Sequence, residues 1–474
     1  MSADNSKENE LDQEDQCQLY SSAGYSATEP SFDDEIDSQT SQEEEIWFDG
    51  DDFDMDGKTA NWDAPPCPAP LGIAHIVRIG ACDFCIGRIG GSMTDVSNVE
   101  KGSSLRSDAY ERDQELSTNI VQDFCPLCEN LFDDIENIVE RVSDSLSETK
   151  FSTIQFGIHL PKDLIQEEDR IRNRFGAPAS YPLKGALVVE IHKLMKEQNK
   201  DIVFVKEKPD VMVLVDGLTL RVDIDVRPIF LYGRYRKLSR EIPQTRWPCR
   251  SCRGRGGNCQ SCEGSGMQYL DSVQDLIGEP LRAALIGEDT SFHGMGREDI
   301  DVRCLGRGRP FVIEIKKPTY RDYNLSELVK MVNDNGSEKV EIDELSWCTR
   351  SMVNKVKETR SEKTYTIRFK VAEVGDEETS KEAIYGLSGK IIDQETPKRV
   401  SHRRAAKVRR RKVNSVDQVT IEGDEIQITI RCEAGTYVKE LVHSDEGRTS
   451  PSIKSALDTE CEVIWLDVEE IHAD

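Results

Sequence analysis

The chain has 474 residues and a formal net charge of −28, which is long enough for about two to four domains with substantial cores. The first 60 residues hold 19 acidic residues and 2 lysines, so the remainder is only mildly acidic and a polyanionic partner is not excluded. No apolar run reaches the roughly 20 residues of a membrane span, and the acidic start lacks the layout of a signal peptide. We therefore expect a soluble, cytoplasmic protein.

Residues 1–66 are rich in Ser, Asp, Glu and Gln and have few periodic apolar positions. This composition predicts a disordered acidic tail. A solvating role is the plain interpretation. Mimicry of a nucleic-acid backbone, which would inhibit the protein, is the alternative.

Eight of the 14 cysteines form four Cys-x-x-Cys pairs, a spacing that favours metal ligation in a reducing compartment over disulfides. Two thiolates on one tight turn supply half of a tetrahedral zinc shell, and a second turn completes it. In the later cluster the pattern Cys-x-x-Cys-x-Gly-x-Gly occurs twice, and its glycines free backbone N–H groups to turn toward sulfur. The sequence therefore predicts two structural zinc sites, one on Cys82, Cys85, Cys125 and Cys128, the other on Cys249, Cys252, Cys259 and Cys262.

Apolar residues between 131 and 146 recur at helical spacing, and the following segment reads as an α/β module. Its expected elements are a helix near 186–195 and strands near 202–205, 211–215 and 220–226. Aromatic rings then alternate with cations over Leu231–Lys237, which includes Arg234. Rings that stack on bases and cations that meet phosphates make this a candidate RNA contact. A solvated strand face would have the same pattern.

A helix is expected to begin after Ser272, a credible N-cap. It leads into Ser291–Arg303, where charged groups crowd beside two glycines just before a strand at 310–315. Glycines allow the backbone to bend or to approach a ligand closely. The segment is therefore either a loop that presents a reactive side chain or a charged surface turn.

Further strands are expected at 363–370 and 427–432, because their residues alternate between apolar and polar. The densest basic run, residues 397–412, lies between them. It favours a surface that faces phosphates, with a nuclear-localisation signal as the alternative. A strand, a glycine and a helix then follow over 433–441, where Lys439 could bring an ammonium to a buried carboxylate.

These segments together resemble the tRNA pseudouridine synthase family known as Pus-ten, over about residues 70 to 470. The resemblance rests on several independent motifs. They are Leu231–Lys237, Pro243–Cys249, Gly296–Arg303, Gly308–Val312, Lys363–Tyr365, His402–Arg404, Gly435–Lys439 and Gly447–Thr449.

The resemblance implies an α+β fold in which an accessory RNA-binding domain with a four-cysteine zinc site and a THUMP-like module precedes a pseudouridine synthase domain with a mixed, mainly antiparallel sheet. We expect the acidic tail at 1–66, the accessory domain at 67–246, a zinc knuckle at 247–267 and the catalytic domain at 268–474. The implied substrate is tRNA, at uridines 54 and 55 of the T-loop. Zinc would be structural, no organic or nucleotide cofactor would be needed, and we expect a monomer.

By the same resemblance Asp299 matches the essential aspartate, Lys439 the basic residue beside it, and Tyr365 the tyrosine that stacks on the target base. Asp301 is the other candidate acid, and Glu298 is expected to be structural or solvated. The expected RNA contacts are Arg234, Arg297, Tyr365, Tyr437, Arg403, Arg404, Arg409, Arg410 and Arg448.

Two other classes of function compete with this interpretation. A non-catalytic zinc-containing RNA-binding or chaperone-like protein would share the cysteine repeats, although no J-type His-Pro-Asp motif accompanies them. Another THUMP-type tRNA-modifying enzyme would need a glycine-rich cofactor loop that opens a helix. Gly294 and Gly296 precede acids and a strand instead.

Overall fold

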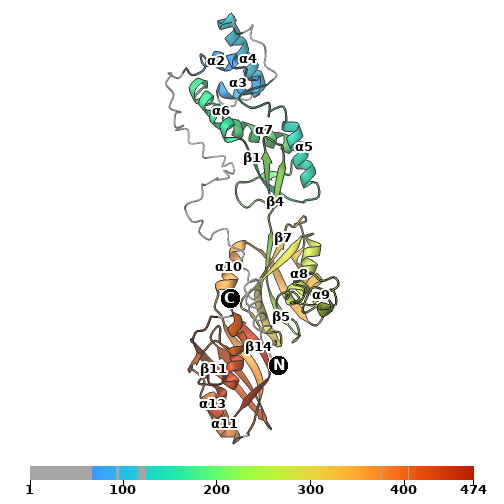
Figure 1. Ribbon diagram of the computed structural model, residues 1–474, viewed down its shortest axis with the longest axis vertical. Coiled ribbons are helices and arrows are strands. Elements are labelled where there is room, and N and C mark those ends of the chain that lie inside the picture. The colour runs from blue at the N-terminus through green and yellow to red at the C-terminus, as the bar shows by residue number, and fades with distance from the viewer. Residues whose placement is uncertain are drawn as a thin grey trace, which may run out of the picture.

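The computed structural model describes residues 67–91, 96–114, 116, 124–373, 375–403 and 405–473. The molecule is elongated, and two units follow one another along its long axis (Figure 1). The acidic tail predicted for residues 1–66 lies outside the described residues. Among the helices of the described ranges, none combines the length and apolarity needed to span a bilayer.

The first unit combines helices with a four-stranded sheet in the order β2-β1-β3-β4. Strand β1 runs parallel to β2 and β3, and β4 is antiparallel to β3. Helix α5 and strands β2 to β4 match the expected elements. Helix α6 was not predicted, although Leu164 and Ile171 recur at helical spacing and are buried on one of its faces. The elements are α2 (Ile73–Arg78), α3 (Asp83–Ile89), α4 (Asn98–Arg112), α5 (Ile135–Leu146), β1 (Thr153–His159), α6 (Lys162–Phe175), α7 (Leu183–Gln198), β2 (Val203–Phe204), β3 (Val211–Asp216) and β4 (Val222–Val226).

The second unit is built on one long sheet in the order β13-β10-β11-β12-β9-β14-β7-β5-β8, with β6 paired to β7. Its pairs are antiparallel except β7 with β14, which is parallel, so the predicted mixed, mainly antiparallel sheet is confirmed. The elements are β5 (Ile229–Lys237), η2 (Gln260–Cys262), α8 (Val273–Ala284), β6 (Asp289–Gly294), β7 (Val302–Lys316), α9 (Leu325–Gly336), β8 (Val340–Cys348), α10 (Arg350–Glu358), β9 (Glu362–Val371), α11 (Glu377–Tyr385), β10 (Ile391–Gln394), η3 (Lys398–Arg403), β11 (Arg409–Glu422), β12 (Glu425–Cys432), α12 (Val438–His443), β13 (Thr449–Ser450), α13 (Ile453–Leu457) and β14 (Cys461–His472).

Local sequence explains why several of these elements form where they do. Strand β12 alternates strictly between half-buried and buried residues, as expected for a strand with one face on the core. The Ser272 side chain accepts a hydrogen bond from the Asp275 N–H and so caps α8. These agreements arise where the period or the cap is contained in a short stretch of chain.

Strand β5 corrects the boundary that the sequence analysis set at residue 246. It pairs with β7 and β8 of the second sheet, and Leu231 and Tyr235 belong to the core of the second unit. The physical division lies between the end of β4 at Val226 and the start of β5 at Ile229. The alternation of this strand is the same in either sheet, so its pattern alone does not assign it to a unit.

Candidate active site

The loop between β6 and β7 is held from inside the protein by the buried carboxylate of Glu298. This side chain is fully buried and lies 2.8 Å from the Arg309 guanidinium. It also accepts a hydrogen bond of 2.8 Å from the Tyr235 hydroxyl, and the Gln244 amide donates both to Tyr235 and to the Gly296 carbonyl. Glu298 is thus paired, hydrogen-bonded and withdrawn from solvent, so it serves as the structural anchor of the loop.

Two cations from β5 and the segment after it hold the loop backbone. The Lys237 ammonium is fully buried and donates to the carbonyls of Asp299 at 3.2 Å and Ile300 at 2.8 Å. Arg240 donates to the Asp301 carbonyl at 3.3 Å and is itself held by the buried Asp467. Burial lowers the pKa of Lys237 to about 8, against the opposing charges of Glu298 and Asp301. Three successive carbonyls are therefore fixed, which sets the direction of the Asp299 side chain.

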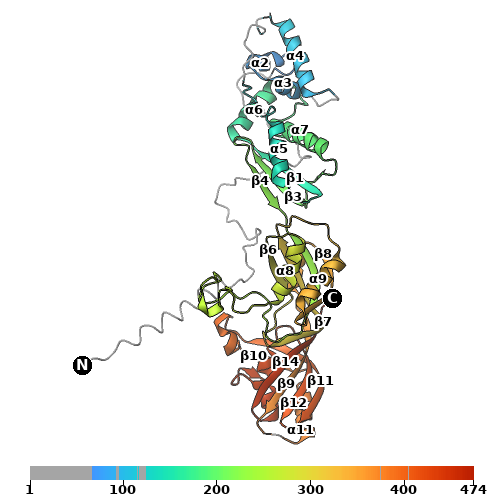
Figure 2. The same ribbon diagram turned by 90° about the vertical axis from the view of Figure 1, so that its right-hand side faces the viewer.

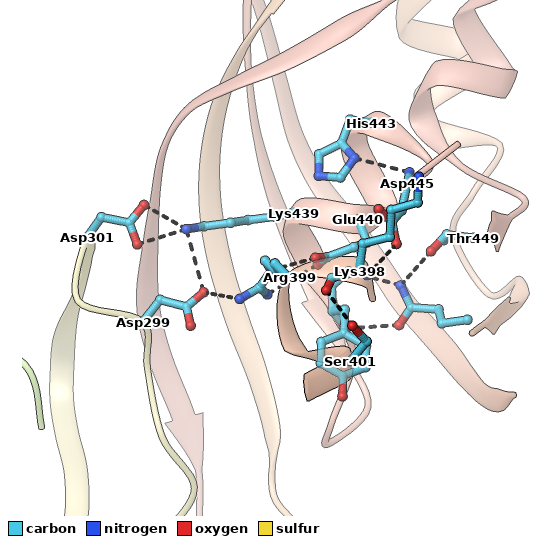
Figure 3. Close-up of polar contacts among 12 residues, drawn as sticks. Asp299, Asp301, Lys398, Arg399, Ser401, Lys439, Glu440, His443, Asp445 and Thr449 are labelled. Carbon is cyan, nitrogen blue, oxygen red and sulfur yellow. Dashed lines mark hydrogen bonds and ion pairs between the residues drawn. The ribbon is translucent and has the colours of Figure 1, made fainter. Parts of the chain in front are cut away.

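The Asp299 carboxylate points outward, toward two cations that come from distant segments (Figure 3). It lies 2.7 Å from the Arg399 guanidinium and 3.6 Å from the Lys439 ammonium. The Asp299 side chain keeps 32 % of its surface exposed, so a ligand can reach it. The predicted meeting of Asp299 with Lys439 is found, at the first turn of α12, whereas the second cation was not anticipated.

Lys439 lies closer to Asp301 than to Asp299. Its ammonium donates to both carboxylate oxygens of Asp301, at 2.8 and 2.7 Å (Figure 3). Burial would raise the pKa of Asp301, but the hydrogen bond and charge of Lys439 outweigh it and lower the pKa. The Asp301 side chain remains 66 % exposed, twice as much as that of Asp299. Lys439 therefore bridges the two acids.

Arg399 and Glu440 complete the charged cluster, and sequence reasoning missed both. The Glu440 side chain is buried and accepts two hydrogen bonds from Arg399, one from Nε at 2.6 Å and one from the terminal nitrogen Nη2 at 3.3 Å. Arg399 is thus oriented by a buried carboxylate while its remaining nitrogen meets Asp299. The only local signal is that Arg399 lies in the basic run and Glu440 follows Lys439.

Tyr365 lies on β9, a central strand between β12 and β14. The residue is 8 % exposed and belongs to the same hydrophobic cluster as Met295 of the loop. Burial raises the pKa of its hydroxyl above the usual range. The ring therefore belongs to the apolar layer behind the loop that carries Asp299.

The expected RNA contacts divide into different environments. Arg234 does not lie on a solvated strand face. Its guanidinium donates to the carbonyls of Gly308 on β7 and Ile471 on β14, both at 3.0 Å, and so links β5 to these strands. Arg410 is 74 % exposed and pairs with Asp393 at the surface. Arg448 is half-buried in the turn before β13.

The other expected contacts lie near aromatic rings or outside the described side chains. Arg409 lies over the ring of Tyr437, 5.9 Å from its centroid, and Tyr437 immediately precedes α12. Arg297 lies over the ring of Trp247, 5.3 Å from its centroid, at the base of the knuckle. The Arg403 side chain and all of Arg404 fall outside what the structure describes.

The two cysteine clusters each bring four sulfur atoms together, all within 4.8 Å of one another. A tetrahedral zinc ion with bonds of about 2.3 Å needs sulfur atoms about 3.8 Å apart. Representative separations are 3.8 Å for Cys82 and Cys128, and 3.7 Å for Cys252 and Cys262. Four thiol ligands and these distances fit a closed structural zinc site in both places.

Glycines complete the second cluster as the sequence predicted. The N–H groups of Gly256 and Gly266 donate to the sulfur atoms of Cys252 and Cys262, at 3.3 and 3.2 Å. Both glycines have positive φ, +63° and +77°, which a residue with a side chain adopts only with strain. The knuckle that they form projects from the side of the second unit (Figure 2).

Comparison with known proteins identifies the family of this chain. Residues 230–472 match the family model described as the Pus10 C-terminal domain, and residues 138–216 match the archaeal Pus10 THUMP domain. The chain belongs to the Pus10 family. The expected accessory THUMP module and the α+β pseudouridine synthase fold are thereby confirmed, and the chain is placed among isomerases. The family match begins one residue after the start of β5, in agreement with the boundary found in the sheet.

Relatives named tRNA pseudouridine synthase Pus10 match most of the chain. The protein of Methanothrix thermoacetophila is 37% identical over 84% of this chain and 93% of its own length. The protein of Methanocaldococcus jannaschii is 35% identical over 82% of this chain and 92% of its own length. Among solved structures, a Cbf5-Nop10-Gar1 complex is similar at 18% identity with a TM-score of 0.28, over 42% of this chain and 45% of that chain.

Proposed function

We propose that this Pus10 family member converts uridine to pseudouridine at positions 54 and 55 of the tRNA T-loop, with Asp299 as the catalytic group. The reaction breaks the bond from ribose C1′ to N1 of uracil, turns the base, and joins C1′ to C5. The C5 proton leaves and N1 gains one, so no atom is added and no electron is transferred. An ionised carboxylate serves this chemistry as a nucleophile toward the sugar or as a base on it.

One observation carries the proposal: Asp299 stands on an anchored loop, partly exposed, between the Arg399 guanidinium and the Lys439 ammonium. The two cations hold the carboxylate in one orientation, and its exposed part is open to a substrate. Asp301 is the less suitable acid, because both of its oxygens are engaged by Lys439.

We assign Tyr365 to the target base, which must leave its stack before reaction. The basic surface around Arg409 and Arg410, with Tyr437, would contact the T-arm. Cations meet phosphates and an aromatic ring offers a stacking surface. Arg234 is removed from the set of RNA contacts because its guanidinium is engaged within the protein.

The test is the position of pseudouridine in a tRNA transcript after incubation with purified protein and no added cofactor. Wild-type protein should form pseudouridine in the T-loop, and Asp299→Ala should form none while its RNA affinity stays near that of wild type. An active Asp299→Ala protein would defeat the assignment. An equal loss in Asp301→Ala, with RNA binding intact, would move the catalytic role to Asp301.

The two cysteine clusters are proposed to hold structural zinc, because all four ligand positions in each are occupied by protein sulfur. Elemental analysis should find about two zinc ions per chain. Cys252→Ser should lower this content by one ion without unfolding the first unit. A content that stays unchanged in Cys252→Ser would remove the knuckle from the zinc sites.

A further inference from the structure

The two units are joined by a very short link. Strand β4 of the first sheet ends at Val226 and β5 of the second sheet begins at Ile229, so Arg227 and Pro228 alone connect them. The buried hydrophobic clusters of the described residues are separate, because the cluster of the first unit reaches no further than Ile224. No shared apolar core therefore fixes how the units are oriented, and polar contacts must do so.

Arg321 makes the central contact across this link. Its guanidinium donates to the Asp210 carbonyl at 3.1 Å and to the Arg227 carbonyl, within the link itself. It also lies 3.5 Å from the Asp210 carboxylate, and its side chain is only 17 % exposed. A guanidinium offers several donors in a fixed plane, so one side chain can hold two carbonyls and a carboxylate together.

Asp210 connects Arg321 to the sheet of the first unit. Its carboxylate accepts hydrogen bonds from the N–H groups of Ser152 at 2.9 Å and Thr153 at 3.0 Å, where β1 begins. Its carbonyl also accepts from the Arg227 N–H at 3.0 Å. The side chain of Arg321 thus engages the start of the sheet as well as the link.

The segment that carries Arg321, residues 317–324 between β7 and α9, is fixed to the second unit. The N–H groups of Thr319 and Tyr320 donate to the carbonyls of Ile286 and Leu285, just after α8. The Thr319 carbonyl accepts from the Lys150 N–H at 2.7 Å, and the Lys150 ammonium lies over the Tyr320 ring at 4.7 Å. Arg321 is therefore the charged centre of a contact whose two sides belong to different units.

We propose that Arg321 is a specificity-determining residue, which fixes the separation between the THUMP-containing unit and Asp299 so that one tRNA engages both at once. The inference rests on the proposed function, since it requires tRNA as the substrate. A rigid link keeps the second contact at a high effective concentration once the first has formed. Without Arg321 the Lys150 contacts remain across the link but its charged centre is lost. The two units should then move more freely, and a long RNA should lose much of its advantage over a short one.

The experiment compares two RNAs, a full tRNA transcript and the isolated T-arm stem-loop of the same tRNA. Wild-type protein should bind the full tRNA more tightly than the stem-loop. Arg321→Ala should weaken binding of the full tRNA about tenfold, because the two contacts are no longer held in register, and leave the stem-loop affinity unchanged. The affinity of Arg321→Lys for the full tRNA should lie between those of wild type and Arg321→Ala. An ammonium keeps the charge but lacks the planar fork that spans two carbonyls.

Arg221→Ala is the matched control, because Arg221 lies just before β4, is 73 % exposed and pairs with the exposed Asp223. It should bind both RNAs as wild type does. Small-angle scattering without RNA should show a broader range of separations for Arg321→Ala than for Arg221→Ala. Equal weakening of both RNAs in Arg321→Ala, or no weakening of either, overturns the proposal. These binding and scattering results do not depend on which uridine is modified, so they separate this inference from the proposed T-loop activity.

Discussion

Glu298 and Asp299 are adjacent acids that the fold treats in opposite ways. Glu298 turns inward, is fully buried and meets Arg309, Tyr235 and Gln244. Asp299 turns outward and meets cations that approach from other segments, with about a third of its surface exposed. The inner face of the loop thus serves stability, while the outer face is left available for chemistry.

This difference shows how the proposed catalytic carboxylate, Asp299, is kept in place without being buried. Burial of Asp299 would cost solvation and block the substrate. Instead, its neighbour supplies the buried anchor, and Lys237 fixes the carbonyl of Asp299 itself. The position of the outer acid is therefore determined by groups on the inner face.

The largest expected effect comes from breaking the inner face. Glu298→Gln leaves Arg309 as a buried charge without its partner, which should lower the free energy of unfolding by about 3–5 kcal/mol. Asp299→Asn should change it by about 1 kcal/mol or less, because its ion pairs are partly exposed. Chemical denaturation of both variants measures the contrast. Equal stabilities would contradict the division into two faces.

The next effect is the pH dependence of activity, which should follow the charge of Lys237, the ammonium that holds the loop backbone at Asp299. The pKa of Lys237 is lowered to about 8 by burial, so its ammonium loses its charge as the pH rises through 8. Pseudouridine formation should therefore fall above pH 8, and Lys237→Arg, which stays charged, should retain more activity at pH 9. Burial also lowers the pKa of Lys363 to about 8. If Lys237→Arg declines as wild type does while Lys363→Arg does not, the titrating group is Lys363.

The third effect concerns Arg399, the cation that contacts Asp299 on the outer face, and Glu440, which orients Arg399. Arg399→Gln removes the closer cation from Asp299 and should lower kcat about 100-fold, the scale of a small misplacement of a reacting group. Glu440→Gln should have a smaller effect, because Arg399 keeps its contact with Asp299 but loses the charge that orients it. Single-turnover rates at saturating tRNA measure both. A Glu440→Gln protein that is as slow as Arg399→Gln would show that the orientation of Arg399 matters as much as its charge.

The sequence predicts the elements of this site better than their contacts. The Ser272 cap, the glycines of the knuckle and the strand before Lys439 are determined by neighbours a few residues away. The partners of Glu298 and Asp299 are not. Asp299 meets Arg399 across 100 positions, and Tyr235 meets Glu298 across 63. A local pattern does not distinguish the acid that is buried as an anchor, Glu298, from the acid that faces outward, Asp299. The contacts made in the folded sheet distinguish them.

The alternation of β5 illustrates the same limit. Its cations and rings predicted an RNA contact, but every second residue of the strand is buried, so Tyr235 and Lys237 turn to the core. Successive side chains of a strand point to opposite faces, so its pattern shows which residues share a face but not which elements cover that face. The pairing with β7 and β8, which is set by residues far along the chain, determines this.

The smallest expected effect concerns Asp301, the second acid on the outer face. Asp301→Asn removes an ion pair with Lys439 whose acidic partner is 66 % exposed, and its loss should change activity by less than about fivefold. The freed ammonium remains within reach of Asp299, only 3.6 Å away, so the cation beside the proposed catalytic carboxylate is retained. Measured rates for Asp301→Asn and Asp299→Asn at one tRNA concentration make the comparison. A large loss in Asp301→Asn that stays smaller than the loss in Asp299→Asn would mean that Lys439 must be held by Asp301 before it can serve Asp299.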